Sequence, residues 1–193
     1  MQMCLVIHGF PAVGKTSVCR QLVHVIGKKL SLGIIQGDFF AHMIYGCTYT
    51  EMEIELKYRN MYRIMDNLFS FGRSVIVDDF FKREADISSF LTHMSAWDGV
   101  HQIYIHLCAD KEVRLERNRV RDYWDWIPET RLINFMENDF NFPDEFVLDN
   151  SAKIADDTVE DILTFLVSQG IYDSDLPDVV PEFFKPIQDP RPE

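Results

Sequence analysis

The 193-residue sequence has few features that would tie it to a membrane or to an oxidising compartment. No apolar run approaches the roughly 18 residues of a membrane-spanning helix, and no leader resembles a signal or transit peptide. The cysteines are widely spaced without a C-x-x-C pair, so we expect reduced thiols rather than disulfides or zinc ligands. They are Cys4, Cys19, Cys47 and Cys108. These absences favour a cytoplasmic protein with no membrane partner.

Basic residues are also scarce. The chain has 19 Lys and Arg against 31 Asp and Glu, a formal net charge of −12. A protein whose main task is to bind nucleic-acid backbones needs a basic face, so this balance disfavours nucleic acid as the partner. A small local basic site remains compatible with it.

The sequence does contain ample material for a packed core, because 47% of its residues are hydrophobic and 13% aromatic. Its length predicts one domain, which we place at residues 1–170. Residues 171–193 carry five of the eight prolines and many acids, which predicts a peripheral acidic tail.

The most informative motif is G-x-x-x-x-G-K-[ST] at residues 9–16. It follows an apolar run, residues 3–7, and precedes apolar positions at helical spacing up to Gly27, so it has the strand–loop–helix setting of a P-loop. We expect the backbone of this loop to wrap a triphosphate, with Lys15 at the β- and γ-phosphates and the Thr16 hydroxyl on Mg²⁺. The predicted nucleotide-binding residues are Gly9, Phe10, Pro11, Ala12, Val13, Gly14, Lys15, Thr16 and Ser17.

Predicted strands and helices alternate along the rest of the chain. This order predicts an α/β fold: a three-layer αβα sandwich of the P-loop NTPase type, with a five-stranded, mostly parallel sheet and a small helical lid. Further strands are expected at 32–37, 74–77, 101–108 and 145–148, and helices at 51–71, 82–95, 110–121, 129–139 and 156–168. The apolar face of the helix at 51–71 is assigned to Met52, Leu56, Met61, Ile64, Met65 and Leu68.

Three acidic residues follow predicted strands, where ligands of parallel sheets bind. Asp38 can accept the proton of an attacking hydroxyl, or it can cap the next helix. Asp78 and Asp79 fit a Walker-B arrangement that holds Mg²⁺, with Asp78 preferred, or they belong to a solvated turn.

Arginines cluster on the predicted helix at 110–121. Arg117 and Arg121 share a helical face and precede an aromatic loop, so we expect them on a lid at about 117–130, where both would stabilise the transferring phosphate and Arg117 would also bind nucleotide. Arg114 and Arg119 are assigned to surface salt bridges.

Residues for the phosphoryl acceptor are harder to select. Arg59 and Arg63 can bind an anionic acceptor or belong to the surface, and Trp124 and Trp126 can cover the nucleotide or pack the lid. Four more side chains can line an acceptor pocket or the core: His42, Tyr45, Tyr49 and Tyr58. No role is assigned to His8, His101 or His106.

The motifs together resemble a family. Strand–GFPAVGKT–helix, an Asp after the second strand, GRSVIVDD and YIHLCADKEVRLERNRVRD are similar to the small P-loop kinases of the zeta-toxin, chloramphenicol phosphotransferase and polynucleotide kinase type. RNRVR followed by INFMENDFNFP also resembles the seryl-tRNA kinases. The resemblance implies ATP as donor, Lys15 and Thr16 on phosphate and Mg²⁺, Asp38 as base, and Arg117 and Arg121 as lid arginines. No RNA-binding domain is evident, which disfavours a tRNA substrate.

We therefore predict an ATP- and Mg²⁺-dependent kinase that transfers the γ-phosphoryl group to a hydroxyl of a small-molecule or nucleoside-like acceptor. One alternative is a kinase of nucleic-acid or tRNA hydroxyls. The other is a regulatory module that binds and hydrolyses a nucleotide to switch a partner.

Overall fold

The computed structural model describes residues 2–44, 46–121, 126–134 and 140–176. Five strands form one sheet in the order β2-β3-β1-β4-β5, and every neighbouring pair is parallel. The strands are β1 (Gln2–His8), β2 (Leu32–Gln36), β3 (Ser74–Asp78), β4 (Val100–Cys108) and β5 (Phe146–Asp149). The predicted α/β fold with a parallel five-stranded sheet is confirmed.

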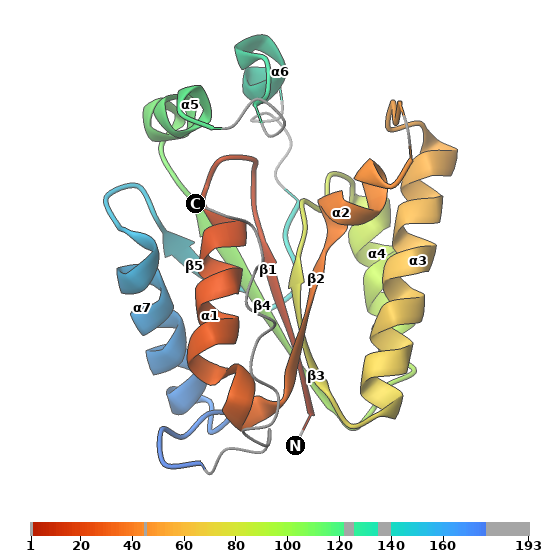
Figure 1. Ribbon diagram of the computed structural model, residues 1–193, viewed down its shortest axis with the longest axis vertical. Coiled ribbons are helices and arrows are strands. Elements are labelled where there is room, and N and C mark those ends of the chain that lie inside the picture. Colours follow the sequence, from red (N-terminus) through yellow and green to blue (C-terminus); the bar gives the residue numbers. More distant parts are fainter. Residues whose placement is uncertain (1, 45, 122–125, 135–139, 177–193) are drawn as a thin grey trace, which may run out of the picture.

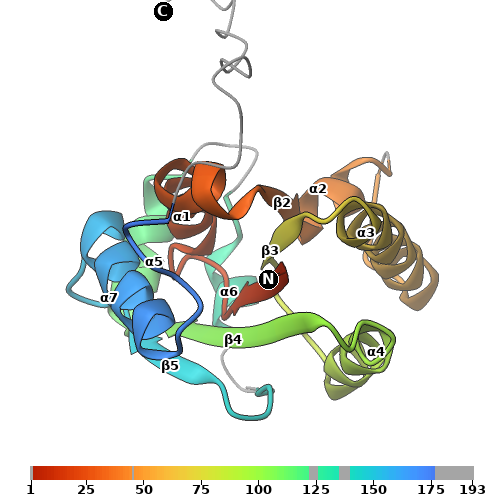
Figure 2. The ribbon, with the colours of Figure 1, turned by 90° about the horizontal axis from the view of Figure 1, so that it is seen from below.

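Helices cover both faces of this sheet. Figures 1 and 2 show α1 and α7 on one face and α3 and α4 on the other, while α5 and α6 lie beyond the carboxyl ends of the strands. The helices are α1 (Lys15–Leu30), α2 (Gly37–His42), α3 (Glu51–Ser70), α4 (Glu84–Met94), α5 (Lys111–Arg119), α6 (Glu129–Asn134) and α7 (Ala155–Ser168). The β1–α1 loop, which is the predicted P-loop, therefore opens toward α5 and α6.

The core has two layers because successive residues of a strand point to opposite faces. Met3 and Leu5 of β1 pack with Leu22 of α1 and Ile162 of α7. Cys4 lies in the other layer, with residues of α3 and α4. The central strands read as continuous apolar runs because helices cover them on both faces.

The apolar face predicted for α3 is partly wrong. Met52 is 78% exposed, and Leu56 and Ile64 are each 43% exposed. The buried stripe runs instead through Lys57, Met61, Met65 and Phe69, four residues apart, with Tyr58 beside it. Apolar spacing alone selected the wrong residues because a lysine occupies one turn of the buried face. The helix begins with a capping box between Thr50 and Glu53.

Several sequence predictions lie outside the described residues: Tyr45, Trp124, residues 135–139 of the helix predicted at 129–139, and residues 177–193 of the tail. The four cysteines all lie within the described part, as free thiols. No helix in the described ranges is long and apolar enough to span a membrane.

Candidate active site

The P-loop follows β1 directly, and its backbone needs glycine at both ends. Gly9 has φ +136°, and a Cβ there would lie 2.1 Å from the carbonyl oxygen of Leu107. Gly14 has φ +104°, again in the left-handed half of backbone space that glycine tolerates. Inside the turn, Lys15 Nζ donates to the carbonyl oxygens of Gly9 at 2.8 Å and Phe10 at 3.0 Å. Burial lowers the pKa of Lys15, although the carboxylates of Asp78, Asp38 and Asp79 oppose the shift.

Asn150, which follows β5, holds the loop from the far side. Its Nδ2 donates to Val13 O at 2.6 Å, and its Oδ1 accepts from Thr158 Oγ1 at 2.6 Å. Arg117 Nη1 donates to the same carbonyl at 3.1 Å. Both donors fix the P-loop backbone, and sequence reasoning missed Asn150.

The Thr16 hydroxyl meets one of the two acids after β3. Thr16 Oγ1 donates to Asp78 Oδ2 at 2.6 Å, and Gln36 Nε2 approaches the same oxygen at 3.4 Å. Burial raises the pKa of Asp78, although the nearby Lys15 charge opposes the shift. A hydroxyl and a carboxylate at the edge of a phosphate loop are the hard oxygen donors that Mg²⁺ takes, so these residues fit the predicted ion.

Asp79 turns away from Thr16 and toward α3. Its Oδ1 accepts from Lys57 Nζ at 2.6 Å, and both side chains are at least nine-tenths buried. The α2 start packs against this pair, since a Cβ on Gly37 would lie 2.1 Å from Asp79 Oδ1. The structure thus brings Asp78 to Thr16, while the second acid predicted for the metal lies in a buried ion pair.

Asp38 lies in the first turn of α2, with its carboxylate exposed at the cavity that the P-loop lines. The N-cap residue of α2 is Gln36, which makes no side-chain capping bond. No hydrogen bond from the α2 backbone to Asp38 occurs within the described residues, so the capping interpretation has no geometric support.

Both predicted lid arginines reach the same cavity. Arg117 Nη2 also donates to Asn150 O at 2.7 Å, whereas Arg121 Nη1 is buried without a hydrogen-bond partner among the described residues. Arg119 pairs with Glu129, as expected of a surface arginine. Arg114, also assigned to a surface salt bridge, is instead 5% exposed and lies over the Phe10 ring.

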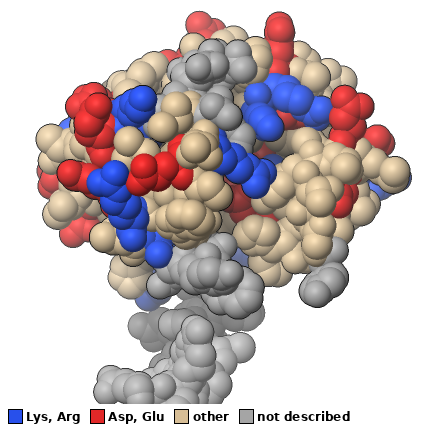
Figure 3. Space-filling model, turned by 90° about the horizontal axis from the view of Figure 1, so that it is seen from above, with Lys and Arg blue, Asp and Glu red and all other residues tan. Residues whose placement is uncertain are grey.

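One cavity of about 770 Å³ joins these groups, a size typical of small-molecule sites. Its described lining includes seven cations and four carboxylates, an excess of positive charge in a chain of net charge −12. The charged lining residues are Lys15, Lys57, Lys82, Arg117, Arg121, Arg131, Lys153, Asp38, Asp78, Asp79 and Asp86. Figure 3 shows Lys and Arg side chains interspersed with Asp and Glu side chains on this face of the molecule.

The acceptor-side candidates separate clearly. His42, Tyr49 and Tyr58 line the cavity, as does Trp126 of the segment predicted to form a lid. The Arg131 guanidinium lies 5.5 Å from the centre of the Tyr49 ring. This contact joins α6 to the loop between α2 and α3. The other pair of candidates, Arg59 and Arg63, is exposed on α3 and does not line the cavity.

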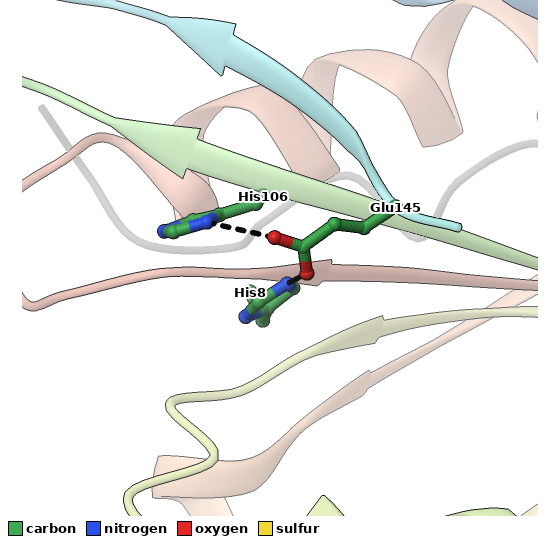
Figure 4. Close-up of side chains that lie close together, drawn as sticks. All are labelled: His8, His106 and Glu145. Atoms are coloured by element: carbon green, nitrogen blue, oxygen red, sulfur yellow. Dashed lines mark hydrogen bonds and ion pairs between the residues drawn. The ribbon is translucent and has the colours of Figure 1, made fainter. Parts of the chain in front are cut away.

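Two histidines without an assigned role form a buried cluster behind the P-loop. Figure 4 shows the rings of His8 and His106 side by side, each facing the carboxylate of Glu145. His8 Nε2 lies 2.8 Å from Glu145 Oε2, and His106 Nδ1 lies 3.1 Å from Oε1. The rings are 24° from parallel, which suits two N–H donors to one carboxylate better than two lone pairs that must converge on one metal ion. The cluster ties β1, just before the P-loop, to β4 and to the start of β5.

Acidification is expected to destabilise the fold through this cluster. Burial and the nearby His106 lower the pKa of His8, although the hydrogen bond with Glu145 opposes the shift. Burial raises the pKa of Glu145, but the hydrogen bonds of its carboxylate with His8 and the Phe142 N–H outweigh burial and hold the pKa below its ordinary value. An unfolded chain therefore takes up protons first as the pH falls, at His8 below about 6.5 and at Glu145 below about 4.5.

The free energy of unfolding should stay level above pH 6.5 and fall below it, as measured by urea denaturation between pH 7.5 and 5.0. His8→Gln should flatten the upper part of this dependence, whereas the exposed His101→Gln should leave it unchanged. Equal slopes in the wild type and His8→Gln would contradict the assignment.

Comparison with known proteins shows which solved structures have a similar fold. No family model and no curated protein matches the chain. A sugar kinase from Janibacter sp. HTCC2649 superposes with a TM-score of 0.65 at 19% identity, covering 90% of this chain and 99% of that one. A gluconokinase from Sinorhizobium meliloti 1021 gives 0.62 at 16%, with coverages of 86% and 93%. The Mycobacterium tuberculosis APS kinase CysC, in complex with AMPPNP and APS, gives 0.65 at 13%, with 86% and 98%. The chain therefore shares the α/β fold of these three kinases.

Proposed function

We propose that this protein is an ATP-dependent kinase that transfers the γ-phosphoryl group to a hydroxyl of a small-molecule acceptor. The observation that carries the proposal is the meeting of three strand ends at one cavity. The P-loop with Lys15 follows β1, Asp38 follows β2, and Asp78 ends β3 beside Thr16. These are the phosphate, base and metal positions that phosphoryl transfer requires.

Each group has a defined task in this proposal. The P-loop N–H groups bind the β-phosphate, and Lys15 leaves its contacts with the loop carbonyls to donate to the β- and γ-phosphates. Mg²⁺, when bound through Thr16 and Asp78, neutralises charge on the same phosphates. Asp38 accepts the proton of the acceptor hydroxyl as the new O–P bond forms and the bond from the γ-phosphorus to the bridging oxygen of ADP breaks.

The cavity also favours a small acceptor over the alternatives. A nucleic-acid substrate calls for a basic track along the surface, and the exposed pair Arg59 and Arg63 lies outside the cavity of a strongly acidic chain. A nucleotide switch positions a water at the γ-phosphate, whereas Asp38 opens onto a cavity with room for a second ligand.

The proposal is tested by acceptor-dependent formation of ADP. The protein, ATP and Mg²⁺ would be incubated separately with sugars, polyols, nucleosides, aminoglycoside-type antibiotics, tRNA and 5′-hydroxyl oligonucleotides. We expect ADP release to rise above the basal rate with a small hydroxylated compound. Stimulation by tRNA or oligonucleotide alone would replace the proposal with the nucleic-acid alternative. A rate that no hydroxyl compound changes would contradict a kinase.

The lid arginines are expected to differ in their effects. Arg121 presents an unpaired donor at the cavity, so Arg121→Lys, which loses the planar fork, should lower kcat by roughly tenfold or more with a smaller change in nucleotide affinity. Arg117→Lys should lower kcat similarly and also weaken nucleotide binding, since Arg117 holds Val13 and Asn150. Steady-state kinetics measures kcat, and nucleotide titration measures the affinity for the nucleotide. Normal turnover in both variants would remove these arginines from the mechanism, and the surface variant Arg119→Lys serves as control.

A further inference from the structure

We infer that the buried ion pair of Lys57 and Asp79 positions Asp38 for catalysis, through the contact that Asp79 makes with Gly37 at the start of α2. This inference rests on the proposed kinase function, because Asp38 is the general base only in that proposal. Lys57 and Asp79 are then positioning residues that act through Asp38. Asp79 has this task in place of the magnesium site to which the sequence assigned it.

The position of α2 depends on few buried residues. The helix has six residues, of which Gly37 and Ala41 are buried, whereas Asp38 is exposed toward the cavity. Its N-cap residue, Gln36, makes no side-chain capping bond. A helix this short has little stability of its own, so its place in the fold comes from what its buried residues touch. The contacts of Gly37, the residue before Asp38, therefore largely set where the carboxylate lies.

Gly37 lies directly against the ion pair. A Cβ at this position would be 2.1 Å from Asp79 Oδ1, 2.5 Å from Asp79 Cγ and 3.0 Å from Lys57 Cε. The φ of Gly37 is not positive, so its backbone conformation is open to other residues as well. What requires glycine here is the close approach of the ion pair, which lets α2 begin in contact with the Asp79 carboxylate.

The ion pair is anchored in the elements that form the core. Asp79 Oδ1 accepts from Lys57 Nζ at 2.6 Å, and the two side chains are 1% and 9% exposed. The Asp79 backbone N–H donates to Ile7 O of β1 at 3.4 Å. Lys57 lies on the buried face of α3, four residues before Met61. The pair thus joins β1, the end of β3 and α3, so α2 is the element that moves when its contact with the pair is disturbed.

Aromatic rings enclose the same region. Lys57 Nζ lies 4.7 Å from the centre of the Tyr58 ring, which is stacked on the ring of Phe81 with 5.8 Å between the centres. Burial, and to a smaller extent the charge of Asp79, raises the pKa of the Tyr58 phenol well above its ordinary value, which keeps the phenol neutral. Since a buried ion pair is a weak source of stability, the gain that we assign to this one is geometric.

The first experiment adds one methyl group to the contact. In Gly37→Ala the new Cβ and Asp79 Oδ1 must separate by about 1.3 Å to reach ordinary contact at 3.4 Å, which displaces Asp38. With the hydroxyl compound that raises ADP release most, we expect kcat to fall by about tenfold or more, while the affinity for ATP changes less than about twofold. Gly33→Ala is the matched control in β2, because its Cβ would meet the side chain of Leu68, and its kcat should stay within about twofold of the wild type.

The second experiment asks whether this loss passes through Asp38. In an Asp38→Asn background the base is already gone, so the addition of Gly37→Ala should lower the residual kcat by less than about twofold. An effect on the fold alone would lower turnover by the same factor in both backgrounds. Equal factors would therefore overturn the inference.

The third experiment removes the ion pair. The double variant Lys57→Met/Asp79→Ala leaves no unpaired buried charge, and without its support for α2 we expect kcat to fall by about tenfold or more. In this background the Cβ of Gly37→Ala finds room, so its addition should change kcat by less than about twofold. The same comparison applies if Gly37→Ala alone fails to fold, because the triple variant should then melt at the temperature of the double variant. A further tenfold loss in the triple variant would overturn the inference.

The outcomes separate this inference from the proposed function. Normal turnover in folded Gly37→Ala and in the double variant, together with a loss in Asp38→Asn, would overturn the positioning role and leave the kinase intact. Normal turnover in Asp38→Asn would overturn the general base, and the positioning role with it. ADP release that no hydroxyl compound changes would contradict the kinase itself.

Discussion

Replacing Lys15 with alanine is expected to abolish phosphoryl transfer and leave the protein folded. Among the described residues, the Lys15 ammonium donates to the carbonyl oxygens of Gly9 and Phe10, and Lys15 does not belong to the hydrophobic side chains that make up the two core layers. In the proposed mechanism its charge lies where negative charge moves during phosphoryl transfer. Loss of one such preorganised contact costs on the order of 10²-fold or more in kcat.

Turnover with ATP and a thermal melt measure the two parts of this expectation. Lys28→Ala is the matched control, because Lys28 is an exposed lysine in the last turn of the same helix, away from the cavity. Full activity in a folded Lys15→Ala protein would contradict the P-loop assignment. Equal losses in both variants would indicate a general effect on α1.

Asp38→Asn should bind ATP normally and lose transfer to the acceptor. The amide keeps the shape of the carboxylate but cannot take the proton of the attacking hydroxyl, and removal of a general base typically costs about 10²- to 10⁴-fold. Since Asp38 is exposed and makes no capping bond to α2, the thermal stability of the Asp38→Asn variant should differ little from that of the wild type.

Nucleotide affinity by titration and kcat with the best acceptor together decide this case. Asp98→Asn, an exposed acid in the turn before β4, controls for the change of charge. A variant that melts at lower temperature but keeps its turnover would show that Asp38 stabilises α2 and is not the base.

The fold was predictable because its signals are local. The P-loop pattern specifies a loop between a strand and a helix, and the alternation of apolar runs with helical segments specifies a parallel sheet. The placement of Asp38 and Asp78 at one cavity was predictable for the same reason, since the carboxyl ends of parallel strands share one edge. Most predicted element bounds lie within one or two residues of the structure, and the start of α3 at Glu51, where Thr50 caps the first turn, agrees with the prediction.

The missed features depend on contacts between distant segments. Sequence alone could not separate Asp78 from Asp79, because consecutive residues point in opposite directions and their partners, Thr16 and Lys57, lie on different helices. Lys57 carried one usable signal, its place in register with Met61 and Met65 on a buried helical face. A lysine at such a position predicts a buried acid opposite it.

The histidine cluster left no local signal either. His8 and His106 are register partners on neighbouring strands 98 positions apart in the chain, and Glu145 reaches them from the turn before β5. In an apolar strand a histidine resembles any other core residue, so only the pairing of β1 with β4 reveals that the two rings share one carboxylate.

The measurement that tests the central claim most directly follows the γ-phosphoryl group itself. The protein would be incubated with Mg²⁺, ATP labelled with ¹⁸O in its γ-phosphoryl group and the acceptor that stimulates ADP release, and the products would be resolved by mass spectrometry. The account predicts that the labelled phosphoryl group appears on the acceptor, joined through the acceptor's own unlabelled oxygen, and that Asp38→Asn loses this product. Recovery of the label only as inorganic phosphate, at the same rate with and without acceptor, would contradict it.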